Sequence, residues 1–176
     1  MKTNIALIGF MGTGKTAVGK LLAEKLGKRF AELDSLIKQK AGKSIPDIFQ
    51  QDGEIAFREL EIEVAREVSN NRNLVIACGG GLALNQINID RLKKESVIVY
   101  LTASPGVILK RTSRDGKTRP MLYSPDKTAR IRELLAFRKP FYQRAADIRI
   151  NTSRQDIESV AERIIGKLKE DESFTQ

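Results

Sequence analysis

Short apolar runs alternate with longer amphipathic stretches along the chain. The runs are typical of buried strands and lie at residues 5–8, 30–33, 74–77, 97–101 and 148–150. Helical spacing of apolar residues predicts helices at residues 15–26, 35–41, two within 44–69, one near 88–94, and others at 105–111, 127–145 and 155–170. In the last of these, Ile157, Val160, Ile164 and Leu168 recur at steps of three and four residues. Strands that alternate with helices in this way favour an α/β fold with a parallel sheet flanked by helices.

The length of 176 residues favours one domain, which we place at residues 1–170, and the polar tail 171–176 is expected to be frayed. The chain has no His, which excludes Ser-His-Asp and Cys-His chemistry. Its single cysteine, Cys78, cannot form an internal disulfide, and the apolar run before Gly9 is too short for a signal peptide or a membrane span. These features predict a soluble, cytoplasmic protein with no membrane partner.

The formal net charge of +9 is concentrated in one segment. Residues 107–139 contain ten basic and three acidic residues. Nucleic-acid binding would favour interleaved aromatic residues, but the segment has only Tyr123 and Phe137. A site for a multiply charged phosphate is therefore the preferred interpretation, and no nucleic-acid partner is expected.

The strongest motif is GFMGTGKT at residues 9–16, which fits GxxxxGK[ST] and lies between a predicted strand and a predicted helix. This is the context of a P-loop, whose backbone N–H groups surround a phosphate at a helix N-terminus. The motif places Lys15 at the β and γ phosphates and the Thr16 hydroxyl on Mg²⁺. A glycine-rich turn that matches by chance is the alternative.

Two carboxylates, Glu32 and Asp34, follow the next predicted strand. Ligands of parallel α/β sheets bind at the carboxyl ends of the strands, so both side chains are expected to face the site. In the alternative interpretation, Asp34 caps a helix that starts at Ser35, and Glu32 is a surface charge.

Arg58 and Glu61 are one helical turn apart and so lie on one face of the helix. They are either an ordinary surface ion pair, or Glu61 holds the Arg58 guanidinium in place to bind a carboxylate. Three consecutive glycines, residues 79–81, end the predicted middle strand. Because three glycines are costly to order in a merely structural turn, we expect the backbone there to approach a ligand closely. The preceding Cys78 is interpreted as a small buried residue rather than a nucleophile.

Residues 112–123 are poor in apolar side chains, contain Gly116 and are expected to form a lid between two helices. Closure of such a lid would bring Arg119 to the phosphates and exclude water. Arg114 and Lys117 in the same segment are interpreted as solvated.

Together these residues resemble the shikimate kinase family, which phosphorylates the 3-hydroxyl of shikimate with MgATP. The resemblance extends from Gly9 to about Asn151 and implies a nucleoside-monophosphate-kinase-like P-loop fold with a five-stranded parallel sheet, a lid and a substrate-binding region at about residues 34–61. It implies that the monomeric enzyme takes shikimate and ATP as its partners. The implied catalytic residues are Lys15, Asp34 and Arg119, and those implied to bind substrate are Asp34, Arg58, Gly79, Gly80, Gly81 and Arg138. Those implied to bind nucleotide are Gly12, Thr13, Gly14, Lys15, Thr16, Ala17, Arg111, Arg119 and Arg154, with Thr16 and Glu32 at Mg²⁺.

One position differs from the family pattern, which has Asp-x-Asp where this chain has Glu32-Leu33-Asp34. Mg²⁺ tolerates little displacement, so the longer Glu32 is ranked below Asp34. Two other classes stay open: a related P-loop kinase for gluconate or a nucleoside monophosphate, and a nucleotide-dependent switch or RNA-binding module. The pair Arg58 and Arg138, which suits a carboxylate on an otherwise neutral polyol, favours the shikimate kinase interpretation.

Overall fold

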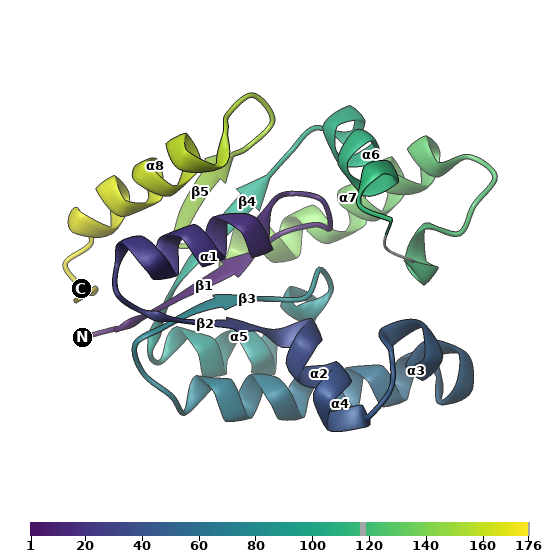
Figure 1. Ribbon diagram of the computed structural model, residues 1–176, viewed down its shortest axis with the longest axis horizontal. Coiled ribbons are helices and arrows are strands. Elements are labelled where there is room, and N and C mark those ends of the chain that lie inside the picture. The colour runs from purple at the N-terminus through teal and green to yellow at the C-terminus, as the bar shows by residue number, and fades with distance from the viewer. Residues whose placement is uncertain (117–118, 176) are drawn as a thin grey trace.

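The computed structural model describes residues 1–116 and 119–175, and its centre is a parallel sheet with the strand order β2-β3-β1-β4-β5 (Figure 1). The strands are β1 (Asn4–Ile8), β2 (Arg29–Glu32), β3 (Leu74–Ala77), β4 (Ser96–Thr102) and β5 (Ile148–Asn151). All four neighbouring pairs are parallel, with β1 paired to β3 and β4 in the middle. The predicted five-stranded parallel sheet is therefore confirmed.

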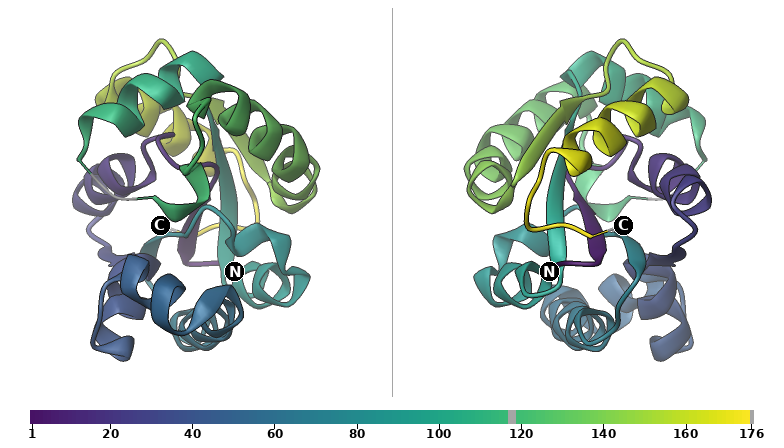
Figure 2. Two further views of the ribbon diagram at one scale, coloured as in Figure 1. Left: turned by 90° about the vertical axis from the view of Figure 1, so that its right-hand side faces the viewer. Right: turned by 90° about the vertical axis from the view of Figure 1, so that its left-hand side faces the viewer.

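Helices cover both faces of this sheet (Figure 2). One face carries α1 (Lys15–Lys25) and α8 (Ile157–Lys169), which pack on alternate residues of β1 such as Ile5 and Leu7. The other layer is formed by α2 (Leu33–Ala41), α3 (Ile45–Gln51), α4 (Gly53–Ser69), α5 (Gln86–Lys93), α6 (Pro105–Arg114) and α7 (Lys127–Ala145), with short 3₁₀ turns η1 (Leu82–Leu84) and η2 (Pro120–Leu122). Residues Ala6 and Ile8 of β1 belong to the core of this second layer. The period of two along a strand thus divides the core into two apolar clusters.

The start of α2 corrects the predicted boundary between strand and helix. The strand ends at Glu32, and the helix begins at Leu33 rather than Ser35, so Asp34 lies in its first turn and is not its cap. Leu33 and Ile37 are fully buried one helical turn apart. The apolar character of Leu33, which predicted a strand residue, belongs to the buried face of the helix.

Two further helices also differ from prediction at their ends. α6 continues three residues beyond the predicted Arg111, to Arg114, and the Thr112 hydroxyl donates to the Ile108 carbonyl inside that extra turn. In α8 the residues Val160, Ile164 and Leu168 are buried as predicted, whereas Ile157 at its first position is 47% exposed.

The C-terminal tail is ordered against the N-terminus, so the prediction of a frayed tail is wrong for residues 171–175, and Gln176 lies outside the described residues. The Lys2 N–H donates to the Ser173 carbonyl, and the Thr175 N–H donates to the Lys2 carbonyl. Phe174 is 7% exposed within the apolar cluster between the sheet and helices α1 and α8, and the Lys28 ammonium lies 5.2 Å from its ring centroid. A single aromatic side chain in a polar segment therefore anchors the tail by burial.

Phe174→Ala is expected to lower the free energy of unfolding by about 3 kcal/mol, because the substitution leaves a cavity in this cluster. Chemical denaturation measures the change, and Ile157→Ala, at an exposed isoleucine of α8, is the matched control with an expected loss below about 0.5 kcal/mol. Equal small losses in the two variants would show that the tail contributes nothing to the core.

No helix in the described part of the chain is long and apolar enough to cross a membrane.

Candidate active site

The P-loop connects β1 to α1 and has the backbone geometry that its glycines predict. Gly12 and Gly14 have φ angles of 77° and 97°, in the left-handed region that favours glycine. The Lys15 ammonium donates to the carbonyls of Gly9 and Phe10, at 2.8 and 2.9 Å. Burial lowers the pKa of Lys15 to about 8, against an opposing effect of the Asp34 carboxylate. The lysine is therefore held over the loop by two carbonyls, with a pKa lowered to about 8.

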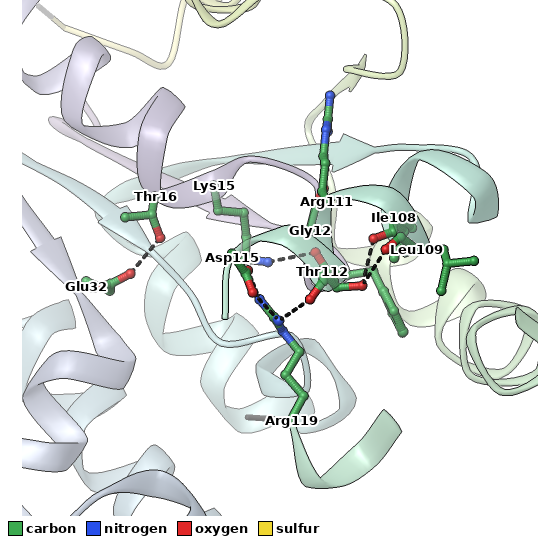
Figure 3. A network of polar contacts seen from close by, with 11 residues as sticks. Gly12, Lys15, Thr16, Glu32, Ile108, Leu109, Arg111, Thr112, Asp115 and Arg119 are labelled. Atoms are coloured by element: carbon green, nitrogen blue, oxygen red, sulfur yellow. Dashed lines mark hydrogen bonds and ion pairs between the residues drawn. The ribbon is translucent and has the colours of Figure 1, made fainter. Parts of the chain in front are cut away.

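Glu32 connects the first turns of α1 and α2. Its Oε1 accepts a hydrogen bond from the Thr16 hydroxyl at 2.5 Å (Figure 3), and its Oε2 accepts one from Ser35 at 2.7 Å. The described residues contain no group of three or more His, Cys, Asp or Glu side chains that could hold a metal ion.

Each of the three glycines at 79–81 leaves space for a charged side chain. A Cβ on Gly79 would lie 3.0 Å from Glu61 Oε1 and 3.1 Å from Asp34 Oδ1. A Cβ on Gly81 would lie 2.4 Å from Nη1 of Arg58, and one on Gly80 would lie 3.5 Å from Nη1 of Arg138.

None of these three glycines has a positive φ, so their role is close approach rather than an unusual backbone conformation. The close approach seen here is that of the protein's own side chains, and the predicted approach of a ligand stays a prediction. The glycines form a strip with carboxylates at one end and guanidinium groups at the other.

Arg58 and Glu61 of α4 form the predicted ion pair, with 2.9 Å between Nη1 and Oε2. The pair is not an ordinary surface contact, because Glu61 is 1% exposed and Arg58 also binds Glu54 at 3.2 Å. Burial raises the pKa of Glu61, and the neighbouring Arg58 guanidinium opposes that shift. Glu61 thus holds Arg58 against Gly81 at the edge of the cleft.

Arg138 of α7 is the second guanidinium and is 2% exposed. Its Nη1 donates to the Gly80 carbonyl at 3.3 Å, and its Cζ lies 5.5 Å from the ring centroid of Phe10. The Tyr142 hydroxyl, one turn along the helix, donates to the same carbonyl. Burial raises the pKa of this phenol to about 12, so it stays protonated as a donor. Sequence reasoning assigned no role to Tyr142, whose spacing of four from Arg138 was the available signal.

Arg111 of α6 joins the P-loop to the end of β5. Its Nη1 donates to the Gly12 carbonyl at 3.1 Å and to Thr152 Oγ1 at 3.0 Å, and its Nη2 donates to the Thr152 carbonyl at 2.8 Å. Thr152 is buried, and its hydroxyl also bonds the Thr13 carbonyl at 3.0 Å. Sequence reasoning missed Thr152, because a threonine after a strand carries no distinctive pattern.

Arg119 lies just before η2, and Figure 3 shows its guanidinium directed toward Asp115 and Thr112. Its Nη1 donates to Asp115 Oδ1 at 2.7 Å and to the Thr112 carbonyl at 3.3 Å, and its Nη2 bonds Asp115 Oδ2. Its positive charge, together with that of Arg138, helps to lower the pKa of Lys15. Arg114 is exposed, as expected, and Lys117 lies outside the described residues.

These residues surround a cleft of about 780 Å³. The predicted site residues that line it are Gly12, Gly14, Lys15, Thr16, Ala17, Glu32, Asp34, Arg58, Gly79, Gly80, Gly81, Arg111, Arg119 and Arg138. Two predicted residues do not line it: Thr13 is buried, with its hydroxyl on the Phe10 carbonyl at 2.8 Å, and Arg154 is exposed. Lining residues that sequence reasoning did not name include Lys38, Phe49, Phe57 and Asp115. The cleft therefore joins a phosphate-binding loop to a pocket that is acidic at one end and basic at the other.

Comparison with known proteins gives a consistent result over almost the whole chain. A shikimate kinase from Caldanaerobacter subterraneus subsp. tengcongensis is 49% identical over 162 residues, which are 92% of this chain and 94% of that protein. The structure of shikimate kinase from Acinetobacter baumannii in complex with shikimate superimposes with a TM-score of 0.93 at 37% identity and covers 98% of this chain and 96% of that one.

A gluconokinase from Sinorhizobium meliloti shares the fold alone, with a TM-score of 0.60 at 16% identity over 96% of this chain and 92% of that one. The nucleoside-monophosphate-kinase-like P-loop fold is thus confirmed. The family model for shikimate kinase matches residues 11–169. The chain belongs to the shikimate kinase family.

Proposed function

We propose that this protein transfers the γ-phosphoryl group of ATP to the 3-hydroxyl of shikimate and releases shikimate 3-phosphate and ADP, in the route to chorismate and the aromatic amino acids. The observation that carries the proposal is the glycine strip at 79–81, with carboxylates at one end, two guanidinium groups at the other and the P-loop beside it. Shikimate has matching chemistry, because it carries a carboxylate and several hydroxyls on a small ring.

The two arginines are proposed to bind the substrate carboxylate. Arg58 and Arg138 come from different helices and meet at adjacent glycines, so a carboxylate between them would meet two cations. Glu61 and the Gly80 carbonyl orient the two guanidinium groups before substrate arrives. Gly79, Gly80 and Gly81 line the same cleft.

Asp34 is proposed to contact the attacking hydroxyl, either taking its proton or aligning it. Its carboxylate lies beside Gly79 in the cleft, at the end of the strip away from the arginines. When the new P–O bond forms and the bond to ADP breaks, negative charge develops on the oxygen that leaves with ADP and is spread over the oxygens of the transferred group. Lys15 and Arg119 stabilise that charge, and a lid at about residues 112–123 excludes water.

The nucleotide is proposed to lie along the P-loop, with its phosphates on the backbone of Gly12, Thr13, Gly14, Lys15, Thr16 and Ala17. Arg111 and Arg154 are proposed to border the adenine. Arg111 lines the cleft, and its bonds to Gly12 and Thr152 fix its position, whereas Arg154 follows Thr152 with an exposed side chain.

Mg²⁺ is proposed to bind at Thr16 and Glu32. The two side chains fit this role, because both present oxygen and the hydroxyl already donates to the carboxylate. Thr16 and Glu32 would hold the ion, and Glu32 would orient the Thr16 hydroxyl through the hydrogen bond between them. The ion supplies charge neutralisation between the phosphates when it is bound.

We propose that residues 1–170 form a single kinase domain, with the substrate-binding region at about residues 34–61. We propose that the protein acts as a cytoplasmic monomer with shikimate and ATP as its partners, without nucleic acid or membrane. A sedimentation measurement of the molecular mass in the presence of both substrates tests whether the protein is a monomer.

An ADP-release assay against shikimate, quinate, gluconate and AMP tests the proposed function. Shikimate is expected to raise ADP release, while gluconate and AMP leave it at the background rate. ADP release that is independent of the acceptor would favour a nucleotide-dependent switch, and release that requires gluconate or AMP would overturn the substrate assignment.

Arg58→Ala and Arg138→Ala should each weaken shikimate binding by about 2–5 kcal/mol, as expected when one member of a buried charged pair is removed. Calorimetry measures shikimate and ADP binding separately, and ADP affinity should change much less. Arg66→Ala, at an exposed arginine of the same helix as Arg58, is the matched control. Normal shikimate binding in both variants would place the carboxylate site elsewhere.

A further inference from the structure

The Asp115 carboxylate occupies an unusual position at the edge of the cleft. Asp115 is the C-terminal cap of α6 and has no place in the catalytic scheme above. A negative side chain there faces the negative end of the helix dipole, so it costs helix stability. It also lines a cleft whose proposed ligand is a polyanion. Neither helix stability nor direct attraction of phosphate explains an acid at this position.

The carboxylate instead holds Arg119. Both oxygens bond the guanidinium, one of them at 2.7 Å to Nη1, and the Thr112 carbonyl takes a further bond from Nη1 at 3.3 Å. The Arg119 side chain is 16% exposed and the Asp115 side chain 34%, so the pair is partly withdrawn from solvent. Because Asp115 ends α6 and Arg119 immediately precedes η2, the pair joins two separate elements rather than two turns of one helix.

The last turn of α6, which Asp115 caps, also contacts the P-loop. Arg111 donates to the Gly12 carbonyl at 3.1 Å, and a Cβ on Gly12 would lie 3.0 Å from Thr112 Cγ2. The last turn of α6 therefore rests on the loop that binds phosphate, and the same turn provides the two groups that hold Arg119 (Figure 3).

We infer that Asp115 is a positioning residue, which orients the Arg119 guanidinium relative to the P-loop before the phosphates bind. The inference rests on the role proposed above for Arg119. An arginine side chain has many rotamers, and a bidentate carboxylate restricts the guanidinium to one orientation. Asp115 thus contributes to the rate through the geometry of Arg119 and makes no contact with the substrate.

A double-mutant cycle tests this inference with Asp115→Asn, Arg119→Ala and the combined variant. Asp115→Asn should lower kcat about tenfold, with the KM for shikimate and the melting temperature unchanged. In the Arg119→Ala background the same substitution should have no further effect on kcat. Asp115→Glu, which keeps the charge, should recover part of the loss. Glu133→Gln, which breaks the ion pair with Arg130 on α7 at 2.9 Å outside the cleft, is the matched control and should leave kcat unchanged.

Each other outcome overturns the inference. Equal loss of kcat from Asp115→Asn with and without Arg119 would show a role independent of the arginine. A raised kcat with tighter ADP binding would show that Asp115 competes with phosphate for Arg119, and an unchanged kcat would show no role. Full activity in Arg119→Ala alone would remove the proposed role of Arg119, a failure distinct from that of Asp115.

Discussion

Lys15→Ala should reduce kcat by about 10²- to 10³-fold, as expected when a preorganised cation is removed from the charge that develops in the transition state. The fold should be unaffected, because the ammonium bonds two carbonyls of its own loop and contributes no apolar contact to the core. A coupled assay and a thermal melt measure the two effects. The exposed Lys20 of α1 provides the matched control, and Lys20→Ala should leave kcat unchanged. Retained activity in Lys15→Ala would contradict the assignment of the P-loop.

The pKa of Lys15 allows a second measurement that needs no turnover. Since burial lowers that pKa to about 8, close to half of the molecules carry a neutral amine at pH 8. A bound diphosphate favours the charged form, so ADP binding at pH 8 should take up about half a proton. Calorimetry in buffers of different ionisation enthalpy measures this uptake, and Lys15→Arg, which is always charged, should abolish it.

Asp34→Asn should lower kcat by about 10²- to 10⁴-fold, the usual contribution of a general base, because the substitution keeps the shape of the side chain and removes its charge. The Mg²⁺ dependence of the reaction should stay unchanged. Glu32→Gln is the paired variant and should chiefly raise the Mg²⁺ concentration needed for half activity, because the Thr16 hydroxyl loses its charged acceptor.

A titration of Mg²⁺ against both variants separates the two carboxylates. A shifted requirement in Asp34→Asn together with none in Glu32→Gln would show that the two roles are reversed. The unmodified chain and Ser35→Ala, which removes the second hydroxyl on Glu32, provide the reference curves.

The sequence predicted the sheet well because its three central strands, β1, β3 and β4, are almost entirely buried and mostly apolar. Boundaries were predicted less well where a residue's apolar character fits two structures. Leu33 could extend a strand or begin a helix, and only its packing beside Ile37 decides between them. The burial of Phe174 was not predicted either, because a single aromatic residue in a polar tail indicates burial only when the apolar cluster that it joins is known.

The site was predictable where the chemistry lies within one motif. The P-loop and the pair Arg58 and Glu61 each follow from spacing along a single element. Contacts between elements were not predictable, such as the contact of Arg111 with Thr152 or that of Tyr142 with the Gly80 carbonyl. Asp115 is the clearest example, because its partner lies across a turn and its position at a helix end is unfavourable on local grounds alone.

The contact of the tail with Lys2 brings the beginning and the end of the described chain close together. Backbone hydrogen bonds join Lys2 to Ser173 and Thr175, so the two ends of the described chain lie side by side (Figure 1). A short peptide linker could therefore fuse the original termini, and new ends could be opened at an exposed connection far from the cleft, such as residues 70–73. The permuted protein would keep the same contacts, but the contacting residues would be separated by different numbers of residues along the chain. Its refolding rate would then report how much loop closure, rather than the final packing, governs the folding of this domain.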